Sequence, residues 1–180
     1  MIKRLLALFA AFFLASGCTG FATVNPEYRL AEHRGIGLIA VAVRTNNDRC
    51  TDNESLIFHS LDDKNRHGQL LLLNLAMAKD FENPPGFFYI YPLKAGNYRF
   101  ESVKAKRFGL AENLDLPFQV AEGKIIYLGE IFVDHQTCTR FTIRTSDQWQ
   151  RDSKLFRERL KHHRLEEVEK QIIKPEQTNR

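Results

Sequence analysis

The chain has 180 residues, with 26 lysines and arginines against 22 aspartates and glutamates, and a net charge of +4. Residues 1–17, which we expect to be removed, carry two of the basic residues and no acid, so the remainder has a net charge of +2. A balance this close to neutral argues against a nucleic-acid-binding protein. The remaining length suffices for one domain with its own core, and 14 Phe and five Tyr favour β-structure.

The N-terminus has the three parts of a secretory signal. Residues 1–4 carry two positive charges, residues 5–15 are apolar, and residues 16–17 are small. The apolar run is too short to span a bilayer as a permanent helix. Leu14-Ala15-Ser16-Gly17-Cys18 resembles the lipobox of bacterial lipoproteins in a variant form. The resemblance implies that Cys18 becomes the lipidated N-terminus of the mature protein.

Lipidation of Cys18 would make the membrane the first partner of this chain. One acyl chain holds a protein to a bilayer marginally, whereas two or more hold it stably. A processed lipoprotein cysteine carries a diacylglyceryl group and usually a further acyl chain, which predicts stable anchoring. Thr19 stands where an Asp often marks retention in the inner membrane. This resemblance favours the outer membrane, with the protein facing the periplasm and residues 18–34 as anchor and tether.

The other two cysteines are Cys50 and Cys138. An exported chain enters an oxidising compartment, and an even number of remaining cysteines predicts one disulfide. Closing this loop of 88 residues would stabilise the fold by about 4 kcal/mol in the chain-entropy treatment. Two free thiols are the alternative, and no C-x-x-C motif accompanies either cysteine.

Residues 35–146 predict a mainly β domain, a single antiparallel β-sandwich of about seven or eight strands. Its first strand, residues 38–44, is apolar on both faces, which predicts cover on both sides. Pro117 places its strand at an edge or a bulge, and Gly129 marks a bulge or a close backbone approach. Residues 69–79 fit a helix or a buried strand, and we favour the strand. Further strands are expected at 56–61, 87–93, 97–104, 116–120, 125–133 and 137–145.

The hydrophobic period changes after residue 146. Residues 147–174 predict a C-terminal amphipathic α-helix, because Trp149, Phe156 and Leu160 share one face at 100° per residue. The apolar stripe shifts across residues 161–164, so the helix bends there or meets a second surface with its latter half. Its apolar face packs on the sandwich or on a partner, and we favour the sandwich. Residues 175–180 form a tail.

Two motifs resemble a known family. Residues 92–100, Pro-Leu-Lys-Ala-Gly-Asn-Tyr-Arg-Phe, resemble the L-x-x-G-x-Y turn of transthyretin-like and carboxypeptidase-regulatory-like β-sandwiches. Residues 118–131 resemble a second element of small bacterial lipoproteins with such domains, an apolar strand that ends in Tyr-x-Gly-x-Ile. The resemblance covers residues 87–145 best. It implies a transthyretin-like sandwich in an envelope lipoprotein, with no catalytic residues to carry over.

Candidate catalytic and metal-ligating residues are few. The chain has no G-x-S-x-G motif, and Asp134-His135 is its only adjacent acid–histidine pair. We interpret that pair as two loop residues at a strand end. His163 and Glu167 have the i, i+4 spacing that could share an ion, but no third ligand stands at a clear spacing. We therefore predict no catalytic residue, no metal and no cofactor.

Residues 151–164 are richer in positive charge than the rest of the chain. Six basic residues oppose Asp152 and Glu158 in this segment. They form either a solvated helix face or a patch for anionic lipid head groups, lipopolysaccharide phosphate or an acidic partner protein. The six residues are Arg151, Lys154, Arg157, Arg159, Lys161 and Arg164.

These features together predict an outer-membrane lipoprotein that acts as a non-enzymatic binding or accessory module for an unidentified envelope protein. The alternative is a periplasmic hydrolase that acts on cell-wall or sugar polymers. A cleft with a carboxylate pair or a Ser–His contact would favour the hydrolase. A filled sandwich with an apolar patch on the helix or an edge strand would favour the module.

Overall fold

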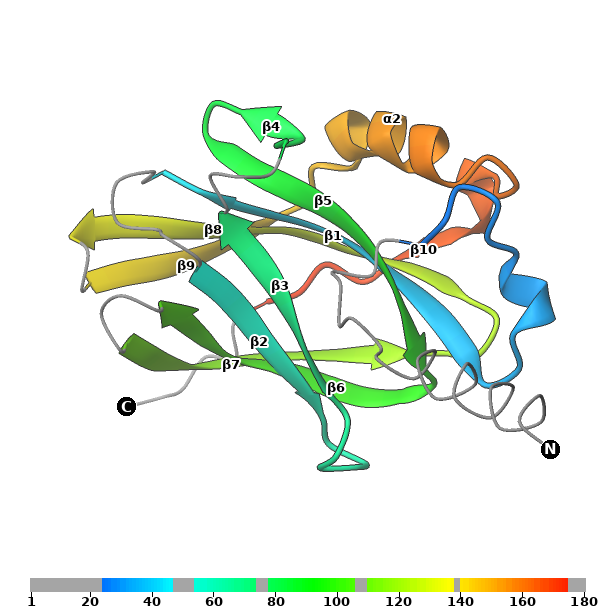
Figure 1. Cartoon of the computed structure of the whole chain (residues 1–180), viewed down its shortest axis with the longest axis horizontal. Helices are drawn as coiled ribbons and strands as arrows, with labels where there is room; N and C mark the ends of the chain where they lie inside the picture. Colours follow the sequence, from blue (N-terminus) through cyan, green and yellow to red (C-terminus); the bar gives the residue numbers. More distant parts are fainter. Residues whose placement is uncertain (1–23, 47–53, 74–77, 106–109, 138–139, 175–180) are drawn as a thin grey trace, which may run out of the picture.

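The computed structural model describes residues 24–46, 54–73, 78–105, 110–137 and 140–174. Two β-sheets pack face to face, and one α-helix covers the outer face of the larger sheet (Figure 1). The chain is therefore mainly β, and the prediction of a β-sandwich with a C-terminal helix is confirmed.

The six-stranded sheet contains β1 (Ile36–Thr45), β4 (Phe81–Glu82), β5 (Pro85–Lys94), β8 (Ile125–Thr137), β9 (Arg140–Ser146) and β10 (Val168–Lys170). The four-stranded sheet contains β2 (Glu54–Ser60), β3 (His67–Leu73), β6 (Gly96–Ala105) and β7 (Leu110–Val120). The helices are α2 (Trp149–Arg159) and the short 3₁₀ helices η2 (Leu30–Glu32) and η3 (Leu165–Glu167).

The larger sheet has the order β10-β8-β1-β5-β4, with β9 also paired to β8. β1 runs antiparallel to β5 but parallel to β8, and β10 runs parallel to β8. The sheet is therefore mixed, not purely antiparallel, and the described residues form ten strands instead of seven or eight. The prediction missed this because turn residues reveal hairpins, whereas parallel neighbours are joined by long crossovers that leave no local signal.

β1 is buried on both faces, as its sequence predicts. Val41 and its alternate neighbours face the four-stranded sheet, whereas Ala40 and its alternate neighbours face α2. The core between the sheets is rich in aromatic rings, with Phe58 at its centre. The ring centre of Phe58 lies 5.7–6.4 Å from those of Tyr91, Tyr98, Phe100 and Phe118.

The C-terminal helix is shorter than predicted. α2 ends at Arg159, and Val168–Lys170 pairs with β8 as a strand. The shift of the apolar stripe thus marks the end of the helix, and is neither a bend nor a second helical surface. Extended structure suits this segment because Val168 is β-branched, and because the first half of β8 offers an open edge.

α2 packs on the sandwich, as we favoured. Phe156 and Leu160 are fully buried with Phe88 and Ile90 of β5 in the layer between helix and sheet. Trp149 is partly buried, and its ring centre lies 4.9 Å from that of Tyr127.

Two predictions for the smaller sheet are also confirmed. The uncertain segment contains a strand, β3, although residues 74–77 lie outside the described residues. Pro117 lies in β7, an edge strand of its sheet. An edge accommodates proline because one side of the strand needs no backbone donor.

Candidate functional site

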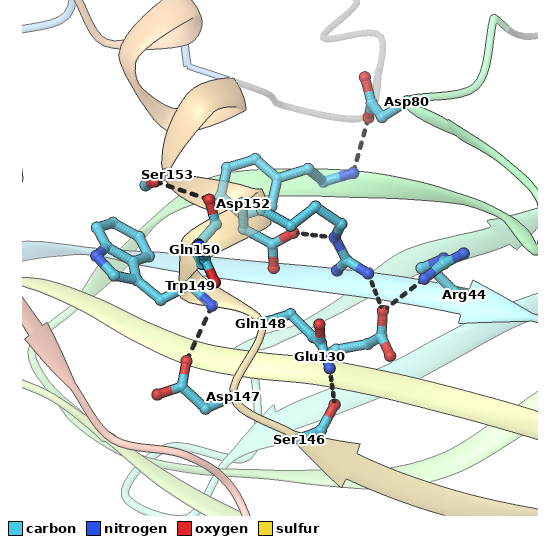
Figure 2. Close-up of polar contacts among 12 residues, drawn as sticks. Arg44, Asp80, Glu130, Ser146, Asp147, Gln148, Trp149, Gln150, Asp152 and Ser153 are labelled. Atoms are coloured by element: carbon cyan, nitrogen blue, oxygen red, sulfur yellow. Dashed lines mark hydrogen bonds and ion pairs between the residues drawn. The ribbon is translucent and has the colours of Figure 1, made fainter.

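A cluster of charged side chains lies between α2 and the six-stranded sheet (Figure 2). Asp152 is fully buried, and its two oxygens accept hydrogen bonds of 2.6 Å from Tyr127 Oη and from Arg151 Nε. Arg151 Nη1 also donates to Glu130 Oε2 at 2.7 Å, and Arg44 Nη1 donates to the same oxygen at 3.0 Å. We call these five residues the buried charge cluster.

The hairpin of β4 and β5 closes one side of this cluster. The guanidinium carbon of Arg44 lies 5.0 Å from the ring centre of Phe81, and that of Arg151 lies 4.3 Å from it. Both distances are within the range of cation–π attraction. Arg44 also donates to the carbonyl of Pro84 from Nε at 3.1 Å and from Nη2 at 2.9 Å. The cluster therefore joins α2, β1, β8 and the hairpin.

Arg159, a second arginine of α2, also forms polar contacts between the helix and the segment below it. Arg159 pairs with the Asp80 carboxylate and donates to the carbonyl of Phe88. Asp80 in turn accepts a hydrogen bond of 2.7 Å from the Phe88 backbone N–H. These contacts attach the last turn of the helix to the start of the hairpin.

A β-bulge brings Glu130 to the helix side of β8. Tyr127 faces α2, so strict alternation would turn Glu130 towards the core between the sheets. The register of β8 against β1 shifts between Tyr127 and Gly129, and this one-residue shift reverses the later side chains. Gly129 has φ +90°, and a Cβ there would lie 2.7 Å from the carbonyl oxygen of Ser146.

The electrostatics of the cluster follow from its burial. Burial raises the pKa of Asp152, and the hydrogen bonds from Arg151 and Tyr127 offset only part of that rise. Burial, together with the bond to Asp152, also raises the pKa of the Tyr127 hydroxyl. Burial alone would lower the pKa of Arg151, but its bonds to Asp152 and Glu130 outweigh this and raise it. Arg151 therefore keeps its charge between the two carboxylates.

The cluster contains a pair of carboxylates, Glu130 and Asp152, of the kind that a hydrolase would use. Both carboxylates are hydrogen-bonded to arginine within the protein. The Arg151 guanidinium bonds to both Glu130 and Asp152 and occupies the space between them. A general acid or base must reach a proton of the substrate, directly or through one water. In this geometry the carboxylates neutralise arginines, which is the chemistry of a structural ion network.

No motif in the sequence points to a role for Arg44, Tyr127, Glu130 or Asp152. Two signals could have found the acids. Glu130 is the only charged residue in the apolar segment 125–133, and Asp152 falls on the apolar stripe of the helix, between Trp149 and Phe156. Carboxylates at core positions are rare unless they are paired, so both positions indicate buried ion pairs.

The six basic residues that the sequence groups as one patch lie in three environments. Arg151 and Arg159 bond beneath the helix, whereas Lys154 is exposed on α2. The other three line an open pocket of about 490 Å³ beyond the end of the helix, which we call the basic pocket. Its lining residues are Arg157, Leu160, Lys161, His163, Arg164, Leu165 and Glu166.

The N-terminal segment of the described chain contacts His162 and His163, and His163 lines this pocket. His162 Nε2 is 2.6 Å from Glu27 Oε2, and His163 Nε2 accepts the backbone N–H of Leu30 at 3.5 Å. His163 Nδ1 lies 3.2 Å from Glu167 Oε2. The described chain therefore begins next to the basic pocket.

The remaining sequence candidates lie elsewhere. Cys18, Cys50 and Cys138 are outside the described residues. Asp134 and His135 lie within β8 and engage different partners. Asp134 pairs with the exposed Arg144 at 3.1 Å, whereas His135 Nε2 is buried 3.1 Å from Glu54 Oε2 of β2.

Within the described ranges, no three His, Cys, Asp or Glu side chains gather where they could hold a metal ion. His163 and Glu167 do contact each other, as their spacing allows. None of the helices in this part of the chain is long and apolar enough to cross a membrane. Comparisons with protein-family models, curated proteins and solved structures find no match.

Proposed function

We propose that this chain is an outer-membrane lipoprotein, anchored through Cys18 and facing the periplasm. Its transthyretin-like sandwich acts as a non-enzymatic binding or accessory module for an envelope protein. The signal pattern of residues 1–17 and the lipobox-like sequence that ends at Cys18 support the anchor.

The observation that supports a binding role is the contrast between engaged and open charges. Glu130 and Asp152 both accept bonds from arginine, which leaves neither poised for proton transfer. Arg157 and Lys161 line an open pocket and form no ion pair with any other described residue. A surface of this kind favours recognition of a negatively charged partner over catalysis.

A hydrolase is the second candidate, because the Glu130 and Asp152 carboxylates both accept hydrogen bonds from the Arg151 guanidinium and because the pKa of Asp152 is raised. Perturbed carboxyl pairs of this kind occur in active sites as well as in ion networks. Hydrolysis would require Arg151 to leave the space between Glu130 and Asp152. The binding module needs no such rearrangement.

Metabolic labelling with palmitate tests the anchor. The native chain should incorporate label, and Cys18→Ser should lose it, because only a processed cysteine at the cleavage site is acylated. Cys138→Ser is the matched control and should keep the label. Undiminished labelling of the Cys18→Ser variant would contradict the proposal.

Cross-linking of the native lipoprotein in cells tests the binding role. We expect one envelope protein to be recovered repeatedly with the native chain and with the carboxamide variant Asp152→Asn. The purified protein should leave wall and sugar polymers undigested. Digestion that is lost in Asp152→Asn would instead favour the hydrolase.

We also propose the Cys50–Cys138 disulfide, because the described flanks of both cysteines converge on His135. Asn46 Oδ1 accepts the His135 backbone N–H at 2.8 Å, and Glu54 Oε2 is 3.1 Å from its ring. Cys50 is four residues from each of these contacts, and Cys138 is three residues from His135. At about 3.3 Å per residue the two cysteines can meet. Non-reducing peptide mapping should find the pair, whereas two alkylatable thiols in periplasmic material would contradict it.

A further inference from the structure

The connection between the expected anchor and the domain is short. Cys18 precedes Val24, where the described chain begins, by six positions, so the two lie within about 20 Å even when the chain is fully extended. The Val24 backbone N–H donates to the Ile90 carbonyl at 3.3 Å, and its side chain packs against the helix-side core. A lipidated Cys18 would therefore hold the domain itself close to the membrane surface.

The basic pocket lies on the side of the domain where this connection begins. Glu27, three residues after Val24, contacts His162, and Leu30 contacts His163 in the pocket wall. The chain from Val24 to Glu27 spans at most about 10 Å. The pocket is thus within reach of the membrane that an anchored Cys18 would occupy.

The charges and shape of the pocket suit a phosphate-bearing head group. Arg157, Lys161 and Arg164 line it, with Glu166 as the opposing acid. Of the neighbouring acids, Glu27 pairs with His162 and also attracts Lys161, and Glu167 pairs with His163 and with Arg164, so Arg157 is the pocket base without such a partner among the described acids. Guanidinium and ammonium groups are the side chains that bind phosphate.

The apolar part of the pocket suits the rest of such a lipid. Partly exposed Leu165 lines the pocket together with the basic residues, whereas Leu160 behind it is fully buried. A lipid head group continues into glycerol and acyl chains, whereas a free phosphate ion offers nothing apolar for Leu165 to contact. This mixed lining favours a lipid over a free ion.

We infer that the basic pocket binds the phosphate of anionic lipids in the membrane that holds Cys18, so that the end of α2 faces the bilayer. The inference rests on the proposed anchor and deepens it, because it gives the domain a fixed orientation on the membrane. An acidic protein is the competing occupant, and it would leave the pocket indifferent to lipid charge.

The test compares the mature lipoprotein in vesicles of phosphatidylcholine with the same protein in vesicles that also contain phosphatidylglycerol. Amide hydrogen exchange of residues 157–166 should slow by about fivefold or more in the anionic vesicles, because bound lipid hinders local opening. High salt should remove the difference by screening the charges. The double variant Arg157→Gln/Lys161→Gln should lose it, and Lys154→Gln, on the same helix but outside the pocket, should keep it.

Equal exchange in the two vesicle types would overturn the inference, and would leave an acidic protein as the occupant. Slower exchange in neutral vesicles supplied with inorganic phosphate would overturn it too, because the site would then bind a free anion. Unchanged exchange in β1 shows that the variants remain folded. Palmitate labelling of the same preparations separates the two proposals. If the protein is labelled but amide exchange is equal in the two vesicle types, only this inference is overturned. If the protein is not labelled, the proposed anchor and this inference are both overturned.

Discussion

The central strands of the six-stranded sheet, β1, β5 and the first half of β8, are buried on both faces, but different chemistry buries each face. Towards the four-stranded sheet these strands present side chains such as Ile39 and Ile131, which pack around the aromatic rings near Phe58. Towards α2 the same strands present Tyr127 and Glu130 beside small and apolar residues. One face therefore meets an apolar core, and the other meets a layer that contains a charge network.

The difference shows how each covering element is held in place. Apolar burial is the dominant stabilising contribution, but it has no direction, so it fixes a position only through shape. Hydrogen bonds to charged groups depend on distance and angle. Asp152 and Arg151 therefore define where α2 sits along the sheet, whereas Phe156 and Leu160 supply most of the free energy that keeps it there.

The largest predicted loss concerns the apolar side. Phe58→Ala should lower the free energy of unfolding by about 4 kcal/mol, because it removes the central ring of the core and leaves a cavity. Phe58→Leu, the control, should cost about 1–2 kcal/mol. Denaturant unfolding measures both. A loss below about 1 kcal/mol for the alanine variant would show that this core rearranges around the missing ring. It would contradict the view that the apolar face contributes more free energy than the charged face.

The charged side should respond to one missing carboxylate. Asp152→Ala should cost about 3 kcal/mol, because it removes the acceptor of fully buried Tyr127 and of partly buried Arg151. Asp152→Asn keeps an acceptor and should cost less. Because the pKa of Asp152 is raised, the folded chain binds its proton more tightly, so the native stability falls as pH rises through that pKa. This fall should be absent in both variants, and its persistence would contradict the assignment.

Local exchange sharpens the comparison further. Amide exchange in α2 should accelerate more than exchange in β2 when Asp152 is replaced by alanine, because the lost bonds position the helix. Equal acceleration in both elements would mean that the cluster stabilises the whole fold instead of placing the helix.

Sequence alone predicted the apolar face better than the charged one. The inward positions of Tyr98 and Phe100 follow from alternation within one strand, which is a local property. The partners of Glu130 are not local, because they depend on the parallel pairing of β8 with β1 and on where α2 lands. The sequence predicts a bulge or a close backbone approach at Gly129, and the structure has both, but the reversal that turns Glu130 towards α2 depends on the register of the sheet. β10 was read as helix because a three-residue strand is defined by its partner.

The β-bulge at Gly129, which turns Glu130 towards α2, can be tested by itself. Gly129→Ala should cost about 2–3 kcal/mol, because φ is +90° there and the new Cβ would meet the Ser146 carbonyl oxygen at 2.7 Å. Gly123→Ala is the matched control, since its φ is +70° but nothing lies within 4 Å of the added Cβ. It should cost about 1 kcal/mol. Equal losses would show that backbone strain, and not the close approach to Ser146, makes glycine necessary at 129.

The smallest effect comes from an exception on the apolar side, where buried His135 of β8 contacts Glu54 of β2 and links the sheets. Burial opposes a charged imidazole, but the Glu54 carboxylate outweighs it, so the pKa of His135 is raised. The stabilisation is therefore complete below the ordinary histidine pKa of about 6.5 and is lost as pH rises through the higher folded value. Unfolding between pH 6 and about 9 should show this decline in the native chain and in His67→Gln, an exposed control, but not in His135→Gln. A decline that survives in His135→Gln would assign it to another group. Its loss would show that the apolar side, too, uses a charge pair where two elements must keep a fixed relation.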